Sequence, residues 1–124
     1  MNQNDIAHAR LANQHLTETT FTTAAEVVAW LVAVQSQDYA GARWALGLRL
    51  PPTTDAAIER AFDEGLILRT HVLRPTWHFV TPDDIRPLLM LTAPRVHQAN
   101  GSMYRQLGLD AATRELFLGG NAQR

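Results

Sequence analysis

The sequence predicts a mainly α-helical domain of the α+β class with one small β-hairpin. Apolar residues recur at helical spacing through most of the 124 residues, and capping residues mark several helix starts. Between residues 66 and 80, two apolar stretches instead bracket Arg74-Pro75, where a proline fits a turn or a strand edge. The length suffices for one compact domain.

Two helices are expected in the first part of the chain. The first, over residues 5–16, is weakly amphipathic. The second begins at Thr22 or Thr23, because Glu26 follows Thr23 by three residues, as in a capping box. Its apolar side chains have helical spacing: Val27, Val28, Leu31 and Val34.

Two more helices are expected before the hairpin. The third runs from Ala40 to Leu50, with Asp38 as its cap and Pro51-Pro52 closing it. Asp55 is expected to cap the fourth, which extends to about Glu64, where Gly65 supplies the stop.

Leu66–Leu73 and Thr76–Val80 form the predicted hairpin. Thr81 then caps a helix that has Pro82 at its first position and is expected to end near Ala93. Two further helices are expected, from Pro94 to Leu107 and from Asp110 to Leu118. The last one places the apolar residues Leu116, Phe117 and Leu118 next to Gly119-Gly120, with little chain left to cover them.

A basic hairpin directly after three short helices is the layout of a winged helix-turn-helix. We therefore expect a winged-helix domain over residues 1–93, with its wing hairpin at about 66–80. Residues 94–124 are expected to form C-terminal helices that lead toward a further domain.

The composition excludes several classes of site. There is no cysteine, so disulfides, thiol catalysis and cysteine-ligated metals are excluded. The histidines do not have the spacing of a ligand set, so no metal site is expected. No apolar run approaches the ~20 residues of a membrane span, and the polar start is not a signal peptide. A cytoplasmic location is the expectation.

The net charge of −1 is unusual for a nucleic-acid binder, but the charge is unevenly distributed. Acidic side chains gather on the fourth predicted helix, and basic ones on the hairpin. All 11 residues counted as lysine plus arginine are arginine. Arginine suits bidentate phosphate contacts, but a genomic composition bias is the preferred explanation for its exclusive use.

The candidate DNA contacts are Arg43, Arg69, His71, Arg74 and His78. His78 alternates with Trp77 and Phe79 along a strand, so it is expected to face the more exposed side. The two hairpin histidines could also face each other or bond within the sheet, and the arginines could simply be solvated. Trp77 and Trp44 are candidates for base stacking, with core packing preferred, and Trp30 is expected in the core.

Three sequence blocks, taken together, resemble a known family: Val34-Gln35-Ser36-Gln37-Asp38, Ala42-Arg43-Trp44-Ala45-Leu46, and Arg69-Thr70 with Leu73-Arg74-Pro75-Thr76-Trp77-His78-Phe79-Val80. The chain is similar, from about residue 6 to about residue 118, to the winged-helix family that includes the AlkZ/YcaQ DNA glycosylases. The resemblance implies excision of alkylated purines or unhooking of interstrand crosslinks. Members are typically two to three times longer, so the chain resembles their N-terminal third.

The family's catalytic motif is a glutamine, a hydrophobic residue, and then glutamine or aspartate. Gln35 and Gln37 match its outer positions, whereas Ser36 departs from the middle one. Residues at i and i+2 point the same way only in an extended segment, where both carboxamides could hold one water. The alternative is a polar helix end with structural glutamines. Asp38 is assigned to the cap, and no cofactor is expected.

Three functions compete on this evidence. The first is a monofunctional DNA glycosylase acting on alkylated duplex DNA, or its N-terminal module. The second is a non-catalytic winged-helix regulator, although the third predicted helix offers only Arg43 and Arg49 for base contacts. The third is a truncated, inactive remnant. We expect the chain alone to bind DNA weakly, with a Kd above ~10 μM at physiological salt.

Overall fold

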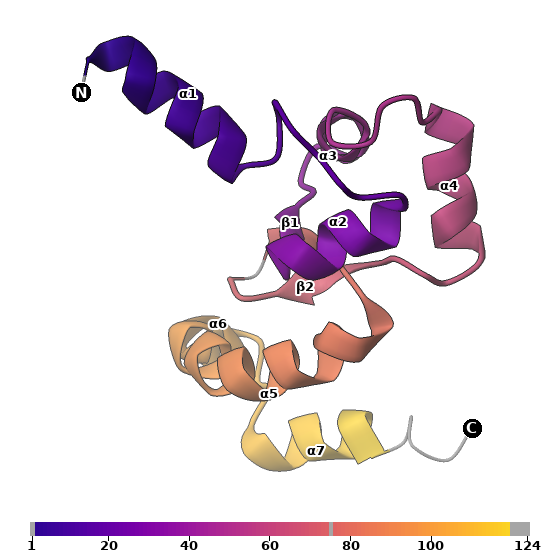
Figure 1. The fold of residues 1–124 in the computed structure, drawn as a ribbon. Helices are drawn as coiled ribbons and strands as arrows, with labels where there is room; N and C mark the ends of the chain where they lie inside the picture. The colour runs from indigo at the N-terminus through magenta and orange to yellow at the C-terminus, as the bar shows by residue number, and fades with distance from the viewer. Residues whose placement is uncertain (1, 75, 120–124) are drawn as a thin grey trace.

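The computed structural model describes residues 2–74 and 76–119 (Figure 1). The elements in chain order are α1 (Gln3–Asn13), α2 (Ala24–Leu31), β1 (Val34–Gln35), α3 (Tyr39–Gly47), α4 (Asp55–Asp63), β2 (Leu68–Val72), β3 (Thr76–Val80), α5 (Pro82–Ala99), α6 (Gly101–Gln106) and α7 (Ala111–Gly119). Within the described residues, no helix is long and apolar enough to cross a membrane.

The three strands form one antiparallel sheet in the order β1-β3-β2. Side chains alternate along β3, so Phe79 and Val80 lie on opposite faces. Phe79 packs into the main core with α2, α3 and α4, and Val80 packs with Val72 and Leu88 of α5. Figure 1 shows α5 on the other side of the sheet from α2 and α3. The predicted α+β class and hairpin are therefore confirmed.

Several predicted helix ends are confirmed by their caps. Thr23 and Glu26 form a capping box, in which the Thr23 hydroxyl accepts from Glu26 N and the Glu26 carboxylate accepts from Thr23 N. Asp38 Oδ1 accepts from Gly41 N at 3.1 Å. Gly65 follows α4 with φ of +71°, a conformation that glycine adopts without strain.

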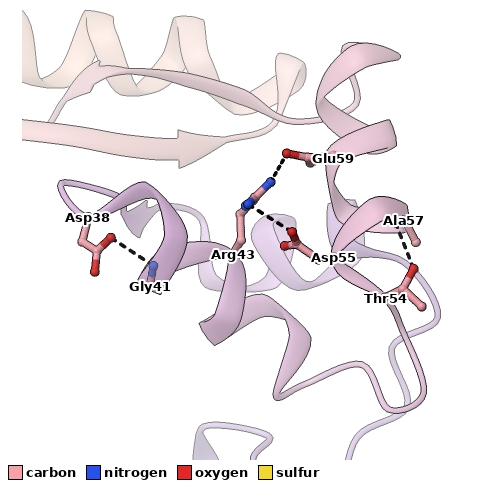
Figure 2. A network of polar contacts seen from close by, with 7 residues as sticks. All are labelled: Asp38, Gly41, Arg43, Thr54, Asp55, Ala57 and Glu59. Carbon is pink, nitrogen blue, oxygen red and sulfur yellow. Dashed lines mark hydrogen bonds and ion pairs between the residues drawn. The ribbon is translucent and has the colours of Figure 1, made fainter.

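Two predictions around α2 and α4 were wrong. Val34 does not continue α2, which ends at Leu31, but pairs with Phe79 as the first residue of β1. Sheet pairing overrides helical spacing there. The cap of α4 is Thr54, whose hydroxyl accepts from Ala57 N (Figure 2), and Asp55 is the first helical residue.

The predicted breaks near Leu50 and Ala93 are also misplaced. Helix α3 ends at Gly47, and a turn follows it. Helix α5 continues through Pro94 to Ala99, so no new helix starts at residue 94. Pro94 removes the hydrogen bond to the carbonyl of Met90, and Met90 lies at the exposed face of α5, where water can replace the donor. The division into domains at residues 93/94 stays a prediction.

Two tryptophans predicted for the core lie near the surface. Trp44 is 71% exposed, and Trp30 is 46% exposed while its ring contacts His15 and Phe21. The helical spacing of both residues favours the interior, but among the described residues neither tryptophan belongs to a core cluster. Leu116 is exposed as expected. Pro75, Gly120 and the side chains of Phe117 and Leu118 lie outside the described part of the structure.

Candidate active site

The segment that carries the two glutamines leaves the edge of the sheet. Gln35 ends β1 opposite His78, and the next residue, Ser36, still donates its N–H to the carbonyl of Trp77 at 2.8 Å. Gln37 lies in the following bend, where its Oε1 accepts from Trp77 N at 3.3 Å. The expectation of an extended backbone is therefore confirmed for Gln35 and Ser36.

Both glutamines line one shallow hollow of about 360 Å³. Asp38 contributes to the same rim, and the rest of the lining comes from α3: Gly41, Ala42 and Ala45. These small side chains leave space beside the two carboxamides. The side-chain carboxamide of Gln35 has no hydrogen-bond partner within the described residues, so it is free to bind a ligand or a water molecule.

Asp38 borders the hollow but is committed to the start of α3. Figure 2 shows its carboxylate directed at the backbone of Gly41. A Cβ atom on Gly41 would lie 2.6 Å from Asp38 Oδ2, so a larger residue there would displace the capping carboxylate from its present position. The predicted assignment of Asp38 as a helix cap is confirmed.

Ser36 is fully buried between the two glutamines. Its hydroxyl has no hydrogen-bond partner within the described residues. The structure thus explains why a hydrophobic residue suits this position, since a buried hydroxyl without a partner carries a desolvation cost of about 1–3 kcal/mol.

We expect Ser36→Ala to raise the free energy of unfolding by about 1 kcal/mol, because alanine removes the unpaired hydroxyl and almost no volume. Urea denaturation monitored by tryptophan fluorescence measures the change. Ser102→Ala, at an exposed position on α6, is the control and should change little. A clear loss of stability in Ser36→Ala would contradict the assignment of an unpaired hydroxyl.

Arg43, predicted as a DNA contact, is engaged inside the protein. Figure 2 shows its guanidinium between two carboxylates of α4, with Nη2 3.1 Å from Asp55 Oδ2 and Nη1 paired with Glu59. The hydrogen bond to Glu59 raises the pKa of Arg43 above its usual value. Only 14% of the side chain is exposed. Arg43 therefore joins α3 to α4, and its positive charge is already balanced.

Arg69 and Arg49 are also held by the protein. Arg69 donates to the carbonyl of Ser36 from Nη2 at 2.9 Å and from Nε at 3.3 Å. Arg49 is buried and donates to the carbonyls of Gln14 and Ala45, and burial lowers its pKa below the usual value. Arg43 of α3 and Arg49 of the turn that follows are therefore both bound within the protein, and neither is placed to contact DNA bases.

The two hairpin histidines differ. His78 is only 8% exposed, so the expectation that it faces the more exposed side was wrong. The reason is that β3 is the central strand of the sheet and both of its faces are covered. The Nδ1 atom of His78 lies 2.9 Å from the carbonyl oxygen of Thr76. His71 is exposed and lies opposite Trp77 rather than His78, with ring centroids 3.9 Å apart. His71 and the exposed Arg74 line a narrow cleft of about 190 Å³ against α5.

Two residues of this region, Trp77 and Tyr39, have structural roles that were not predicted from the sequence. The backbone of Trp77 binds both Ser36 and Gln37, and the ring of Tyr39 contacts Phe79 and the guanidinium groups of Arg43 and Arg69. The position of Tyr39 directly after the cap Asp38 was the available signal.

The family described as DNA glycosylase AlkZ-like matches residues 28–118, which is most of the chain and includes both glutamines and the hairpin. No curated protein and no solved structure matches the chain significantly.

Proposed function

The chain belongs to the AlkZ-like DNA glycosylase family, and we propose that it hydrolyses the N-glycosidic bond of alkylated bases in duplex DNA. The same chemistry would unhook crosslinks that join alkylated bases. The observation that carries the proposal is the placement of Gln35 and Gln37 on one hollow, whose remaining lining is Asp38 and small residues of α3.

The chemistry that two carboxamides offer is to position a nucleophile. A carboxamide is no general base at neutral pH, but it can both donate and accept hydrogen bonds. Gln37 Oε1 already accepts from Trp77, so its amino group faces a water as a donor, and Gln35 can accept. A base alkylated at a ring nitrogen carries positive charge and leaves readily, so an oriented water and a preorganised site supply the remaining help.

The hairpin end of the sheet is the proposed side for the DNA backbone. Trp77 connects this end to the hollow, since its N–H binds Gln37 while its ring contacts His71. Residues 66–119 contain six arginines and four acidic side chains, whereas residues 1–65 contain four arginines and eight acidic ones. We therefore assign phosphate contact to His71 and Arg74, and no longer to Arg43, Arg69 or His78.

A sequence-reading regulator fits the structure less well. Three helices, α2 to α4, directly precede the hairpin, which supports the winged-helix interpretation. The second helix of a helix-turn-helix enters the major groove. With α2 to α4 as the three helices, that helix is α4 rather than the third predicted helix. Its exposed charged side chains are Asp55 and Glu59, both bound by Arg43, and Asp63 against the single arginine Arg60, which gives it little with which to contact phosphate or base edges.

The test is release of a methylated purine from alkylated duplex DNA. The wild-type chain is expected to release the base, and Gln37→Ala to lose that activity. Gln98→Ala, at an exposed position on α5, is the matched control and should keep the activity. If the wild-type chain binds the DNA but releases nothing, the proposal is wrong and a non-catalytic DNA-binding module remains.

A further inference from the structure

We propose that Arg69 is a positioning residue that fixes the Gln35–Gln37 segment for base release, rather than a contact for DNA phosphate. This inference rests on the proposed function and adds a determinant of its rate. It starts from the carbonyl of Ser36, because β1 is only two residues long and this carbonyl lies beyond its last residue.

The guanidinium of Arg69 supplies two donors to that carbonyl, one from Nη2 and one from Nε. The N–H of Ser36 is bound on the other side by Trp77 O. Both polar groups of the Ser36 backbone are therefore occupied, and this fixes the direction of the chain on either side of it. The two glutamines are the residues on either side.

The guanidinium is itself held by aromatic rings. Its carbon atom lies 4.5 Å from the centroid of Trp77 and 5.3 Å from that of Tyr39. A planar guanidinium can stack on a ring and still make two parallel hydrogen bonds, which an ammonium group cannot do. Arg69 forms no salt bridge within the described residues, so its contacts with Ser36 and the rings are what fix it.

Arg69→Lys separates positioning from charge. Lysine keeps the positive charge, so a phosphate contact would survive with a similar salt dependence of DNA binding. A positioning role requires the two donors of the planar guanidinium, which lysine lacks. Misplacing a catalytic group by about 1 Å can lower the reaction rate by about 100-fold. We expect single-turnover base release to fall by about 10- to 100-fold, with DNA affinity and its salt slope unchanged. Arg95→Lys, at an exposed position on α5 with no assigned role, is the control and should keep the full rate.

A second readout does not depend on activity. Amide hydrogen exchange of Ser36 and Trp77 should accelerate by about tenfold or more in Arg69→Lys, while the amides of Leu46 and Phe79 in the core keep their protection. Faster exchange confined to Ser36 and Trp77 supports positioning even if the wild-type chain releases no base. Unchanged exchange at both amides, or weaker DNA binding with a smaller salt slope at a normal rate, would overturn the proposal.

Discussion

Gln35→Ala is expected to lower the rate of base release by about 100-fold or more, because it removes one of the two groups that orient the attacking water. The side chain of Gln35 is exposed at the hollow and has no hydrogen-bond partner within the described residues. Its removal should therefore leave the free energy of unfolding within about 0.5 kcal/mol of the wild-type value. Single-turnover release and urea denaturation of the same preparation measure the two quantities.

A large loss of rate together with an unchanged free energy of unfolding distinguishes a side chain that acts in the reaction from one that only supports the fold. Gln37→Ala also removes the acceptor of Trp77 N, so a loss of activity in that variant alone has two explanations. Gln35→Ala has no such ambiguity. Normal release by Gln35→Ala would contradict the idea that the two carboxamides share one water.

Phe79→Ala should lower the free energy of unfolding by about 3–5 kcal/mol, as expected for truncating a fully buried aromatic residue. Phe79 is inaccessible to solvent, and its ring centroid lies 4.8 Å from that of Phe62 and 5.7 Å from that of Tyr39. It also pairs with Val34 of β1, so the strand that leads into the glutamines depends on it. Domains are typically stable by about 5–15 kcal/mol, so this loss is a substantial fraction of the total and should lower the melting temperature clearly.

Thermal and urea denaturation test this expectation. Leu107→Ala, at an exposed apolar position that follows α6, is the control and should cost less than about 1 kcal/mol. A loss of less than about 1 kcal/mol in Phe79→Ala would contradict the packing of the sheet against α2, α3 and α4.

Local signals in the sequence predicted the elements that depend on neighbouring residues. The Thr23–Glu26 capping box, the Asp38 cap and the glycine at residue 65 each act within a few residues, so the sequence sufficed to find them. Val34 was misassigned because its helical spacing is a local pattern, whereas its pairing with Phe79 joins two residues that are far apart in the sequence.

The candidate site was predictable in part. The sequence left open whether Gln35 and Gln37 lie in an extended segment or at a helix end, and in the structure Gln35 ends a strand while Gln37 lies in the bend that follows. The partners of the arginines did not follow, because Arg43 pairs with Glu59 across two helices and Arg69 reaches Ser36 across the sheet. Exposure of Trp44 depends on which helix face lacks a neighbour, and spacing alone does not reveal that.

The decisive measurement is single-turnover release of a methylated purine from duplex DNA by four proteins: wild type, Gln35→Ala, Gln37→Ala and the double variant. Residues that act on the same water as a unit give non-additive losses. The wild-type chain should release the base, and the double variant should be no slower than the slower single variant. Losses that multiply in the double variant, or a wild-type chain that releases no base, would contradict a shared role for the two glutamines.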